Sequence, residues 1–462
     1  MVVDGWGLVL HFGAMIALLL GCSTPVEVLP IVSSEPNRPI RRWSGGFVEP
    51  SPADPPNVLV IISDDIGIEA SACYRDQIAA DRAPQPTIEG LCAGGLTFND
   101  AWAYPLCSPT RAAMMTGRYA WRTGVGRAID ANSPALSADE ITIVDVIGGE
   151  QSAYIGKWHL TEGMDYPHPN QLGWPHFSGT LSGTLEDYFA YEKTINGTPQ
   201  TSETYATTAV VDDALAWLEA HDSEPWMLWV GFNAAHTPLH VPPADLHDID
   251  LTGLNFDTDP VPFYQAMIQA MDTELGRLLE GIDRDNTVVI YLGDNGTSTQ
   301  VNQGIYPQGH GKGSLGQGGV HVPLIITGPG VEAGSVDAMV HAVDLYATVL
   351  DLLGEPLPTD TALDSMSLMP YLDDPYTEPQ RERMLTELFG TGVPESLSGR
   401  AARGPRHKLV RLFTGTERLY DLQDDPIGTI DLLSAGTLTD EEEEAYQDLS
   451  DYLDQIAAKV EQ

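Results

Sequence analysis

The chain has 462 residues, 42% of them hydrophobic, which is enough to bury a large core in one big domain plus a smaller one. It carries 66 Asp and Glu against 23 Lys and Arg, a formal net charge of -43 at pH 7. This charge argues against nucleic acid as a partner, because binding a phosphate backbone needs a basic surface. We interpret the excess acid as a hydrated surface that keeps the protein soluble.

The N-terminal region predicts export and a lipid anchor. An apolar run at residues 12–20 ends in Leu19-Leu-Gly-Cys22, which resembles the lipobox of bacterial lipoproteins, where the cysteine is acylated. A transmembrane helix is the alternative, but it needs about 20 apolar residues and this run is shorter. We expect a signal peptide at residues 1–21, although the usual basic residues at its start are missing. The protein would then be periplasmic or on the cell surface, attached to the membrane only through Cys22.

Residues 22–55 are rich in Pro and Ser, and we expect a flexible linker there. Two cysteines in the folded part, Cys73 and Cys92, have no motif around them. They could form a disulfide in an oxidising exported compartment, or remain two buried thiols. The sequence leaves both alternatives open.

Residues 56–353 alternate between strand and helix patterns. A continuous apolar run predicts a buried strand at 56–62, and Ser137-Ala-Asp-Glu140 predicts a capping box that opens a helix. The further elements expected in chain order are helices at 137–147, 205–221, 264–278 and 343–353, and strands at 153–155, 226–232, 287–292 and 322–326. This alternation predicts an α/β catalytic domain with a doubly wound, mostly parallel sheet flanked by helices. Ligands of such sheets bind outside the carboxyl ends of the strands.

Residues 354–462 have a different pattern and predict a smaller α+β subdomain. Two short strands at 408–413 and 417–421 flank a Thr-Gly-Thr turn, which indicates an antiparallel hairpin. A terminal helix is expected after Asp440, with an acidic first turn and an apolar stripe. The stripe consists of Ala445, Leu449, Leu453, Ile456 and Val460.

Two polar pairs directly follow predicted strands, Asp64-Asp65 and Asp294-Asn295. Each pair alone is typical of a turn, since Asp and Asn favour turns. Together, at the carboxyl ends of two strands in one sheet, they predict a site for a hard divalent cation, Ca²⁺ or Mg²⁺, rather than zinc.

Lysine is rare in this chain, with only five residues, and two of them lie in motifs with histidine. Lys157 belongs to Gly156-Lys-Trp-His159, and Lys312 to His310-Gly-Lys-Gly. A third motif, Asn233-Ala-Ala-His236-Thr-Pro, follows the strand at 226–232. Surface lysines are normally solvated and lone histidines are normally structural. Each of these motifs therefore indicates a functional site only in combination with the others.

The segment Cys107-Ser-Pro-Thr-Arg111 resembles the sulfatase signature Cys-x-Pro-x-Arg. Together with the motifs above, in the same order, it makes residues 57 to about 433 similar to the formylglycine-dependent sulfatases, of arylsulfatase type, in the alkaline-phosphatase-like superfamily. The resemblance implies that a formylglycine-generating enzyme oxidises Cys107 to an aldehyde. The hydrated aldehyde has one oxygen that attacks sulfur and a second that allows sulfate to be released.

The resemblance also implies residue roles. One divalent cation, most often Ca²⁺, would be held by Asp64, Asp65, Asp294, Asn295 and the modified Cys107. Arg111 would orient the formylglycine, and three residues would contact the sulfate, namely Lys157, His236 and Lys312. His236 or Lys312 would protonate the departing alcohol, and His159 would take the proton from the remaining hydroxyl.

The expected function is hydrolysis of sulfate esters, including those of sulfated carbohydrates, to alcohol and inorganic sulfate. One alternative is a phosphonate or phosphate ester hydrolase of the same superfamily, and another is an inactive surface lipoprotein that binds sulfated glycans. Gln317 and His321 replace the Glu and Arg that the family often has in this loop, and Ser182 is a further candidate for contact with sulfate. Substrate specificity is expected in the loops at 162–201 and 375–403.

Overall fold

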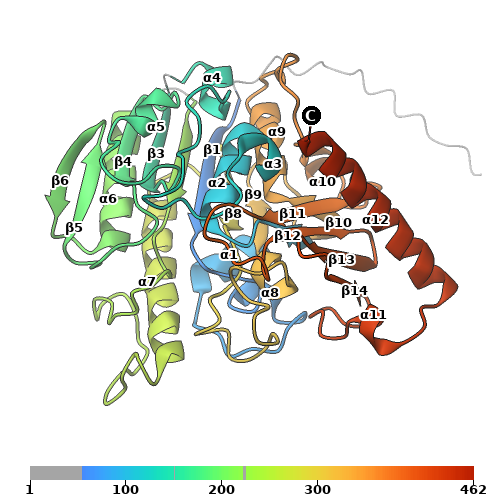
Figure 1. The fold of residues 1–462 in the computed structure, drawn as a ribbon. Coiled ribbons are helices and arrows are strands. Elements are labelled where there is room, and N and C mark those ends of the chain that lie inside the picture. The colour runs from blue at the N-terminus through green and yellow to red at the C-terminus, as the bar shows by residue number, and fades with distance from the viewer. Residues whose placement is uncertain (1–54, 150, 222–224, 462) are drawn as a thin grey trace, which may run out of the picture. The chain divides into compact units, whose positions relative to one another are not determined.

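A computed structural model of the chain describes residues 55–149, 151–221 and 225–461 (Figure 1). The predicted signal peptide, the proposed anchor at Cys22 and the linker up to residue 54 lie outside the described residues. Within the described residues, none of the helices has the length and apolar character needed to cross a membrane.

A ten-stranded mixed sheet organises the larger part of the fold. Its strand order is β10-β2-β9-β8-β1-β7-β3-β4-β5-β6, and its central strands β8, β1, β7, β3 and β4 are mutually parallel. The strands are β1 (Asn57–Ser63), β2 (Leu96–Trp102), β3 (Ser152–Lys157), β4 (His176–Thr180), β5 (Tyr191–Ile195), β6 (Thr198–Ser202), β7 (Met227–Gly231), β8 (Thr287–Gly293), β9 (Leu324–Thr327) and β10 (Gly334–His341).

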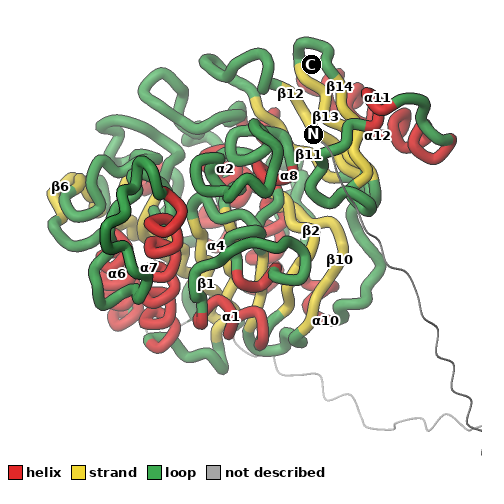
Figure 2. The backbone as a smooth tube through the Cα atoms, turned by 90° about the horizontal axis from the view of Figure 1, so that it is seen from below, coloured by secondary structure: helices red, strands yellow, loops and turns green. Residues whose placement is uncertain are grey.

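Helices cover both faces of this sheet, and β1 shows why. Every residue of β1 is buried, so its side chains enter two cores in alternation. Val58, Val60 and Ile62 belong to the same hydrophobic core as residues of α2 (Cys107–Thr116), α4 (Ile143–Ile147), α9 (Leu345–Leu352) and α10 (Met369–Asp373). Leu59 and Ile61 belong to a second core with residues of α1 (Pro86–Ala93), α6 (Ala206–Ala220) and α7 (Pro260–Glu280). Helices α6 and α7 run side by side on that face (Figure 2). The predicted doubly wound α/β class is confirmed.

The predicted helix at 137–147 is wrong at its start. Ser137 to Glu140 form a turn, and α4 begins only at Ile143. The capping box is made instead by Thr142 and Asp145. The Asp145 carboxylate accepts one hydrogen bond from the backbone N–H of Thr142 at 2.8 Å and another from the Thr142 hydroxyl at 2.9 Å. Ile143 and Val144 are buried against the core and Ser137 to Asp139 are exposed, so tertiary packing selected the later cap.

Several elements had no predicted counterpart. These are the strands β2, β4, β10, β11 (Met384–Leu388) and β12 (Gly399–Arg403), the hairpin β5–β6, the helices α1, α2 and α10, and the short helices η1 (Ala72–Tyr74), α3 (Ala120–Thr123), α5 (His168–Gln171), α8 (Gln317–Val320), η2 (Ala342–Asp344) and α11 (Leu432–Ala435). The β5–β6 hairpin lies at a sheet edge, where polar strands such as Thr198–Ser202 carry no apolar alternation.

The C-terminal region forms a separate four-stranded antiparallel sheet in the order β11-β12-β13-β14. Its strands are β11 (Met384–Leu388), β12 (Gly399–Arg403), β13 (His407–Leu412) and β14 (Glu417–Asp421), and the predicted hairpin is β13–β14. The terminal helix α12 (Asp440–Val460) lies along this sheet and begins with a capping box between Thr439 and Glu442 (Figure 1). Arg403 reaches the larger sheet, where it forms a two-pronged ion pair with Asp100 at 2.7 and 2.8 Å.

The two cysteines left open by the sequence, Cys73 and Cys92, form a disulfide, with Cα atoms 6.0 Å apart. It joins η1 to α1 on the helical layer that also contains α7. The only other cysteine among the described residues is Cys107, which is free and buried.

Leu453→Ala should destabilise the C-terminal region. Leu453 is 2% exposed and packs from α12 against Leu409 and Leu419 of the small sheet. Removing a buried leucine side chain costs about 2–5 kcal/mol, which urea unfolding followed by circular dichroism would measure. The control is Val460→Ala on the same helix, where the side chain is 45% exposed; a similar loss in both variants would contradict the packing described.

Candidate active site

Four adjacent parallel strands bring the predicted motifs to one edge of the sheet. Asp64 and Asp65 follow β1, and Asp294 and Asn295 follow β8. Lys157 is the last residue of β3, with His159 just beyond, and His236 lies in the loop after β7. Because β8, β1, β7 and β3 are neighbours and parallel, their carboxyl ends meet at the same place. The topology therefore assembles these distant segments.

Cys107 reaches the same site from a helix and not from a strand, because it is the first residue of α2. The whole helix is buried, and the Cys107 Sγ atom lies 3.5 Å from Asp64 Oδ1 and 3.6 Å from Lys157 Nζ. The positive end of the helix dipole faces the same point, which favours negative charge there. An oxygen in place of this sulfur would lie between an acid and a base.

The acidic side chains form a cluster that fits a cation. Asp64, Asp65, Asp294 and Cys107 each offer a ligand atom, and these atoms lie within 4.8 Å of one another. Asn295 donates its amide to Asp65 Oδ1 at 2.8 Å, while its own Oδ1 atom is buried without a hydrogen-bond partner. A buried amide oxygen normally has a hydrogen-bond partner, so this one is available to bind a cation. Together with the surrounding carboxylates it offers the oxygen ligands that Ca²⁺ or Mg²⁺ prefers.

Each buried carboxylate of the cluster is paired with one base. Lys157 contacts Asp64, and Lys312 contacts Asp65. Arg111 binds Asp294 Oδ2 through Nε at 3.0 Å and Nη2 at 2.8 Å. When all six side chains are ionised, the three negative charges of the carboxylates and the three positive charges of the two lysines and the arginine sum to zero. A divalent cation bound to the carboxylates would leave the site with about two positive charges in excess, which suits an anionic ligand.

Arg111 is held on several sides and is 1% exposed. Its Nη1 atom donates to the Lys157 carbonyl at 2.6 Å and to the Tyr154 hydroxyl at 3.0 Å. Tyr154 is a site residue that sequence reasoning missed. A tyrosine within an apolar strand carries no signal that separates it from an ordinary core residue.

Burial dominates the acid–base properties of the site. It raises the pKa of Asp64 to about 7 although Lys157 opposes it, and it raises the pKa of the Cys107 thiol to about 12, with Asp294 adding to the effect. For Asp65 and Lys312 burial disfavours both charges, but their mutual attraction wins. The pKa of Asp65 is therefore lowered and that of Lys312 is raised. An unmodified Cys107 would remain a protonated thiol at neutral pH, which is a weak nucleophile.

The two histidines are neutral at pH 7. Burial lowers the pKa of His236 to about 4 and holds that of His159 well below its usual value. His236 Nε2 lies 4.0 Å from Asp65 Oδ2. His159 Nε2 is 3.1 Å from the Ile129 carbonyl, and its Nδ1 atom is buried with no hydrogen-bond partner in the described structure.

A cavity of about 430 Å³ opens onto this cluster. Cys107, His159, His236 and Lys312 line it, and Ser182, the uncommitted candidate, lines it as well. Lys157 and Arg111 lie behind these walls and are fully buried. The structure thus brings all ten predicted residues into one site, and four of them face a space that a small ligand could enter.

The two departures from the family pattern pack the loop that carries Lys312. Gln317 Oε1 accepts a hydrogen bond from the buried ammonium or amine of Lys408 at 3.2 Å. His321 Nε2 lies 2.8 Å from the Asn99 carbonyl. Neither side chain lines the cavity. His240, which had no predicted role, packs at a tilt against the Tyr188 ring with ring centroids 4.2 Å apart.

Comparison with known proteins gives consistent results. The chain is 26% identical over 377 residues to the sulfatase YdeN of Escherichia coli (strain K12), with 69% of this chain and 66% of that protein covered. It is 28% identical over 360 residues to N-acetylgalactosamine-6-sulfatase of Sus scrofa, with 68% and 66% covered. The chain thus spans just under two thirds of the length of these relatives.

Solved structures share the fold. The crystal structure of Ps i-CgsB in complex with k-i-k-neocarrahexaose superposes with a TM-score of 0.70 at 24% identity, covering 82% of this chain and 89% of that chain. A family model described as Sulfatase matches residues 56–355, the span that contains every residue of the site above. Membership of this family implies a divalent cation, and the buried cluster of Asp64, Asp65, Asp294 and Cys107 offers ligand atoms for one. The chain belongs to the sulfatase family.

Proposed function

We propose that the protein hydrolyses sulfate esters to an alcohol and inorganic sulfate, with Cys107 in its formylglycine form and Ca²⁺ as the cation. The observation that carries this proposal is the position of Cys107 at the buried start of α2. There it touches Asp64 and Lys157 on one side and opens to the cavity on the other. A formylglycine-generating enzyme would be the partner needed for maturation.

The modified side chain would supply the nucleophile. A hydrated aldehyde offers one hydroxyl for attack and a second for release of the product, which a serine could not do. Its oxygens would take the place of the Cys107 Sγ atom, close to Asp64 and Lys157. Arg111, held by Asp294 and by the Lys157 carbonyl, would fix the helix that presents them.

The cation would be held by Asp64, Asp65, Asp294, Asn295 and the modified Cys107. When bound, it supplies Lewis-acid stabilisation of negative charge. Neutralising the carboxylates would also free Lys157 and Lys312 from their acid partners. Lys312, which lines the cavity, would then face the sulfate oxygens, and Lys157 would act from behind the wall, 3.6 Å from the Cys107 Sγ atom. Both would stabilise the charge of the transition state, typically the largest catalytic contribution.

Proton transfer falls to the residues around the cavity. His159 has a buried Nδ1 atom without a partner and, as a neutral imidazole, can accept the proton of the remaining hydroxyl. Lys312, whose pKa is raised by Asp65, would donate a proton to the departing alcohol, and the neutral His236 would contact the sulfate in the same cavity. We infer a sulfated carbohydrate as the substrate. The names of two similar proteins, an N-acetylgalactosamine-6-sulfatase and a complex with a neocarrahexaose, support this inference.

Formylglycine-bearing protein should hydrolyse 4-nitrophenyl sulfate much faster than a matched phosphonate ester, because the chain belongs to the sulfatase family. Cys107→Ala should lower turnover to background while leaving the thermal unfolding profile nearly unchanged, since the side chain is small. Mass spectrometry of the peptide with Cys107 would establish the modification. Phosphonate preference would favour the other hydrolase activity. Sulfate turnover by the alanine variant would contradict the nucleophile, and glycan binding without turnover would indicate an inactive lectin-like protein.

Removing the cation should lower activity and thermal stability together. A ligand that binds only the folded state stabilises it by about 2.7 kcal/mol at 100 times its dissociation constant. Adding Ca²⁺ to chelator-treated protein should therefore raise the melting temperature in the wild type. Asp294→Asn should abolish that increase, whereas Asp139→Asn, at an exposed turn, should keep it. Equal Ca²⁺ responses in both variants would show that Asp294 is not a ligand.

We also propose that the protein is an exported lipoprotein anchored at Cys22. The apolar run before Cys22 supports this, and so does the Cys73–Cys92 disulfide, which suits an oxidising compartment. Cys22→Ala should move the protein from the membrane fraction to the soluble fraction, because an acyl chain is the only expected contact with lipid. Cys107→Ala is the matched control and should remain in the membrane fraction. Membrane recovery of the Cys22 variant would refute the anchor.

A further inference from the structure

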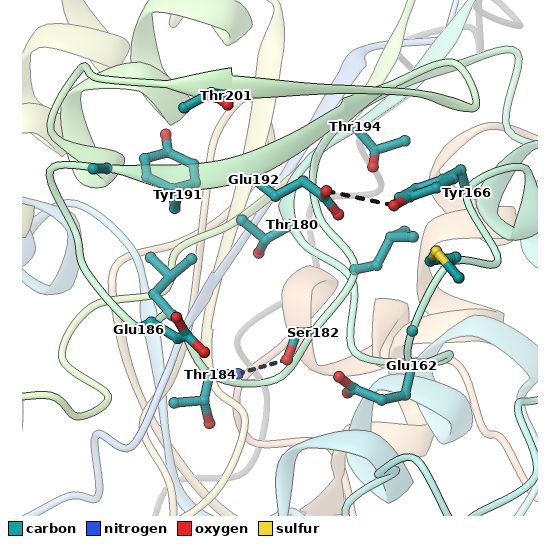
Figure 3. Close-up of a pocket in the computed structure, with 15 residues that line it drawn as sticks. Glu162, Tyr166, Thr180, Ser182, Thr184, Glu186, Tyr191, Glu192, Thr194 and Thr201 are labelled. Carbon is teal, nitrogen blue, oxygen red and sulfur yellow. Dashed lines mark hydrogen bonds between the residues drawn. The ribbon is translucent and has the colours of Figure 1, made fainter.

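A second cavity, of about 830 Å³, lies beside the catalytic one. The two share three residues of their walls, Glu162, Ser182 and Thr184. Figure 3 shows these residues along one side of the larger cavity, with Tyr166, from the segment between β3 and α5, and Glu192 of the β5–β6 hairpin on the other side. A ligand with its sulfate at Cys107 can therefore extend across the shared wall into the larger space.

The two cavities differ in the charge of their walls. Glu162, Glu186 and Glu192 line the larger cavity, and no Lys, Arg or His is among the described residues that line it. The nearest base on the same hairpin, Lys193, is engaged with Asp213 at 2.7 Å. In the catalytic cavity, Arg127 and Lys312 offset Asp130 and the shared Glu162, and its two histidines are neutral. The net negative charge of the lining is therefore confined to the larger cavity.

The walls also carry many hydroxyl groups and aromatic rings. Tyr166 donates a hydrogen bond to Glu192 Oε2 at 3.4 Å, and Thr184 N–H donates to Ser182 Oγ at 3.4 Å (Figure 3). Tyr191 adds a second ring, and further hydroxyls come from Thr180, Thr194 and Thr201. Carboxylates accept hydrogen bonds from hydroxyl and ammonium groups and repel other anions. This lining suits a polyhydroxylated group without negative charge.

We propose that the acidic cavity binds the alcohol part of the ester and selects an unsulfated, uncharged or cationic sugar unit there. Resting on the proposed sulfatase function, this inference narrows the substrate class. The enzyme would remove a sulfate whose neighbouring unit is neutral or an amino sugar, and would discriminate against a neighbour that carries a second sulfate or a carboxylate. Discrimination comes from repulsion of the wrong substrate as much as from contacts with the right one.

The test compares two esters that differ by one carboxylate. 4-Sulfatophenyl β-D-glucoside and 4-sulfatophenyl β-D-glucuronide have the same reacting bond and the same ring size. Formylglycine-bearing wild-type protein should show a kcat/KM about five- to tenfold higher for the glucoside at low ionic strength. The ratio should shrink in 1 M salt, where the screening length falls to about 3 Å.

Two charge-reversal variants test whether the preference for the glucoside over the glucuronide depends on the acidic cavity. Glu192→Lys should bring the glucoside-to-glucuronide ratio to about one or below. Glu203→Lys changes the net charge of the protein equally, but Glu203 is exposed and does not line the cavity, so its ratio should match the wild type. Using the ratio within each variant cancels any change that affects both esters alike.

The failures are distinguishable because 4-nitrophenyl sulfate has no sugar unit to enter the acidic cavity. If this small ester is hydrolysed but wild-type protein uses both glycosides equally, the inference about the cavity is wrong and the sulfatase function stands. Equal ratios in the two variants would overturn it as well. If no ester is hydrolysed, the proposed function fails. NMR titration with phenyl β-D-glucoside and phenyl β-D-glucuronide then decides, and equal affinities would overturn the cavity proposal.

Discussion

The burial of three carboxylates at one edge of the sheet is the constraint on which the rest of the site depends. Asp64, Asp65 and Asp294 are removed from water, and each must meet a compensating charge. The chain supplies one base for each, and removing one partner of such a buried pair typically costs about 3–5 kcal/mol. This requirement explains why Lys157 and Arg111, although wholly buried, remain charged.

The same constraint connects parts of the fold that are far apart in sequence. Arg111 joins α2 to the end of β8 through Asp294 and to the end of β3 through the Lys157 carbonyl. The loop that carries Lys312 continues into α8, where Gln317 accepts a hydrogen bond from Lys408 of the C-terminal sheet. The small sheet therefore supports the catalytic edge without contributing a side chain to the cavity.

The net charge of the whole chain and the charge near the site have to be considered separately. The whole chain carries a formal charge of -43, yet acidic and basic side chains balance in the walls of its catalytic cavity, whereas the adjoining cavity is lined by acidic ones and, among the described residues, no basic one. Long-range repulsion of an anionic ester is screened beyond about 10 Å at 0.1 M salt. Binding is thus decided by the buried groups near Cys107, and discrimination by the acidic wall beyond Glu162.

The sequence alone determined the α/β class and the central strand at 56–62, and it predicted the residues that the fold brings together at one edge of the sheet, because strands and the polar residues that follow them are local signals. Tertiary structure decided what depends on distant neighbours. Burial of Ile143 moved the start of α4, and the position of β3 made Tyr154 a partner of Arg111. The Cys73–Cys92 disulfide, the pairing of each acid with its base and the acidic second cavity also required the assembled fold, since each joins segments whose proximity no local pattern encodes.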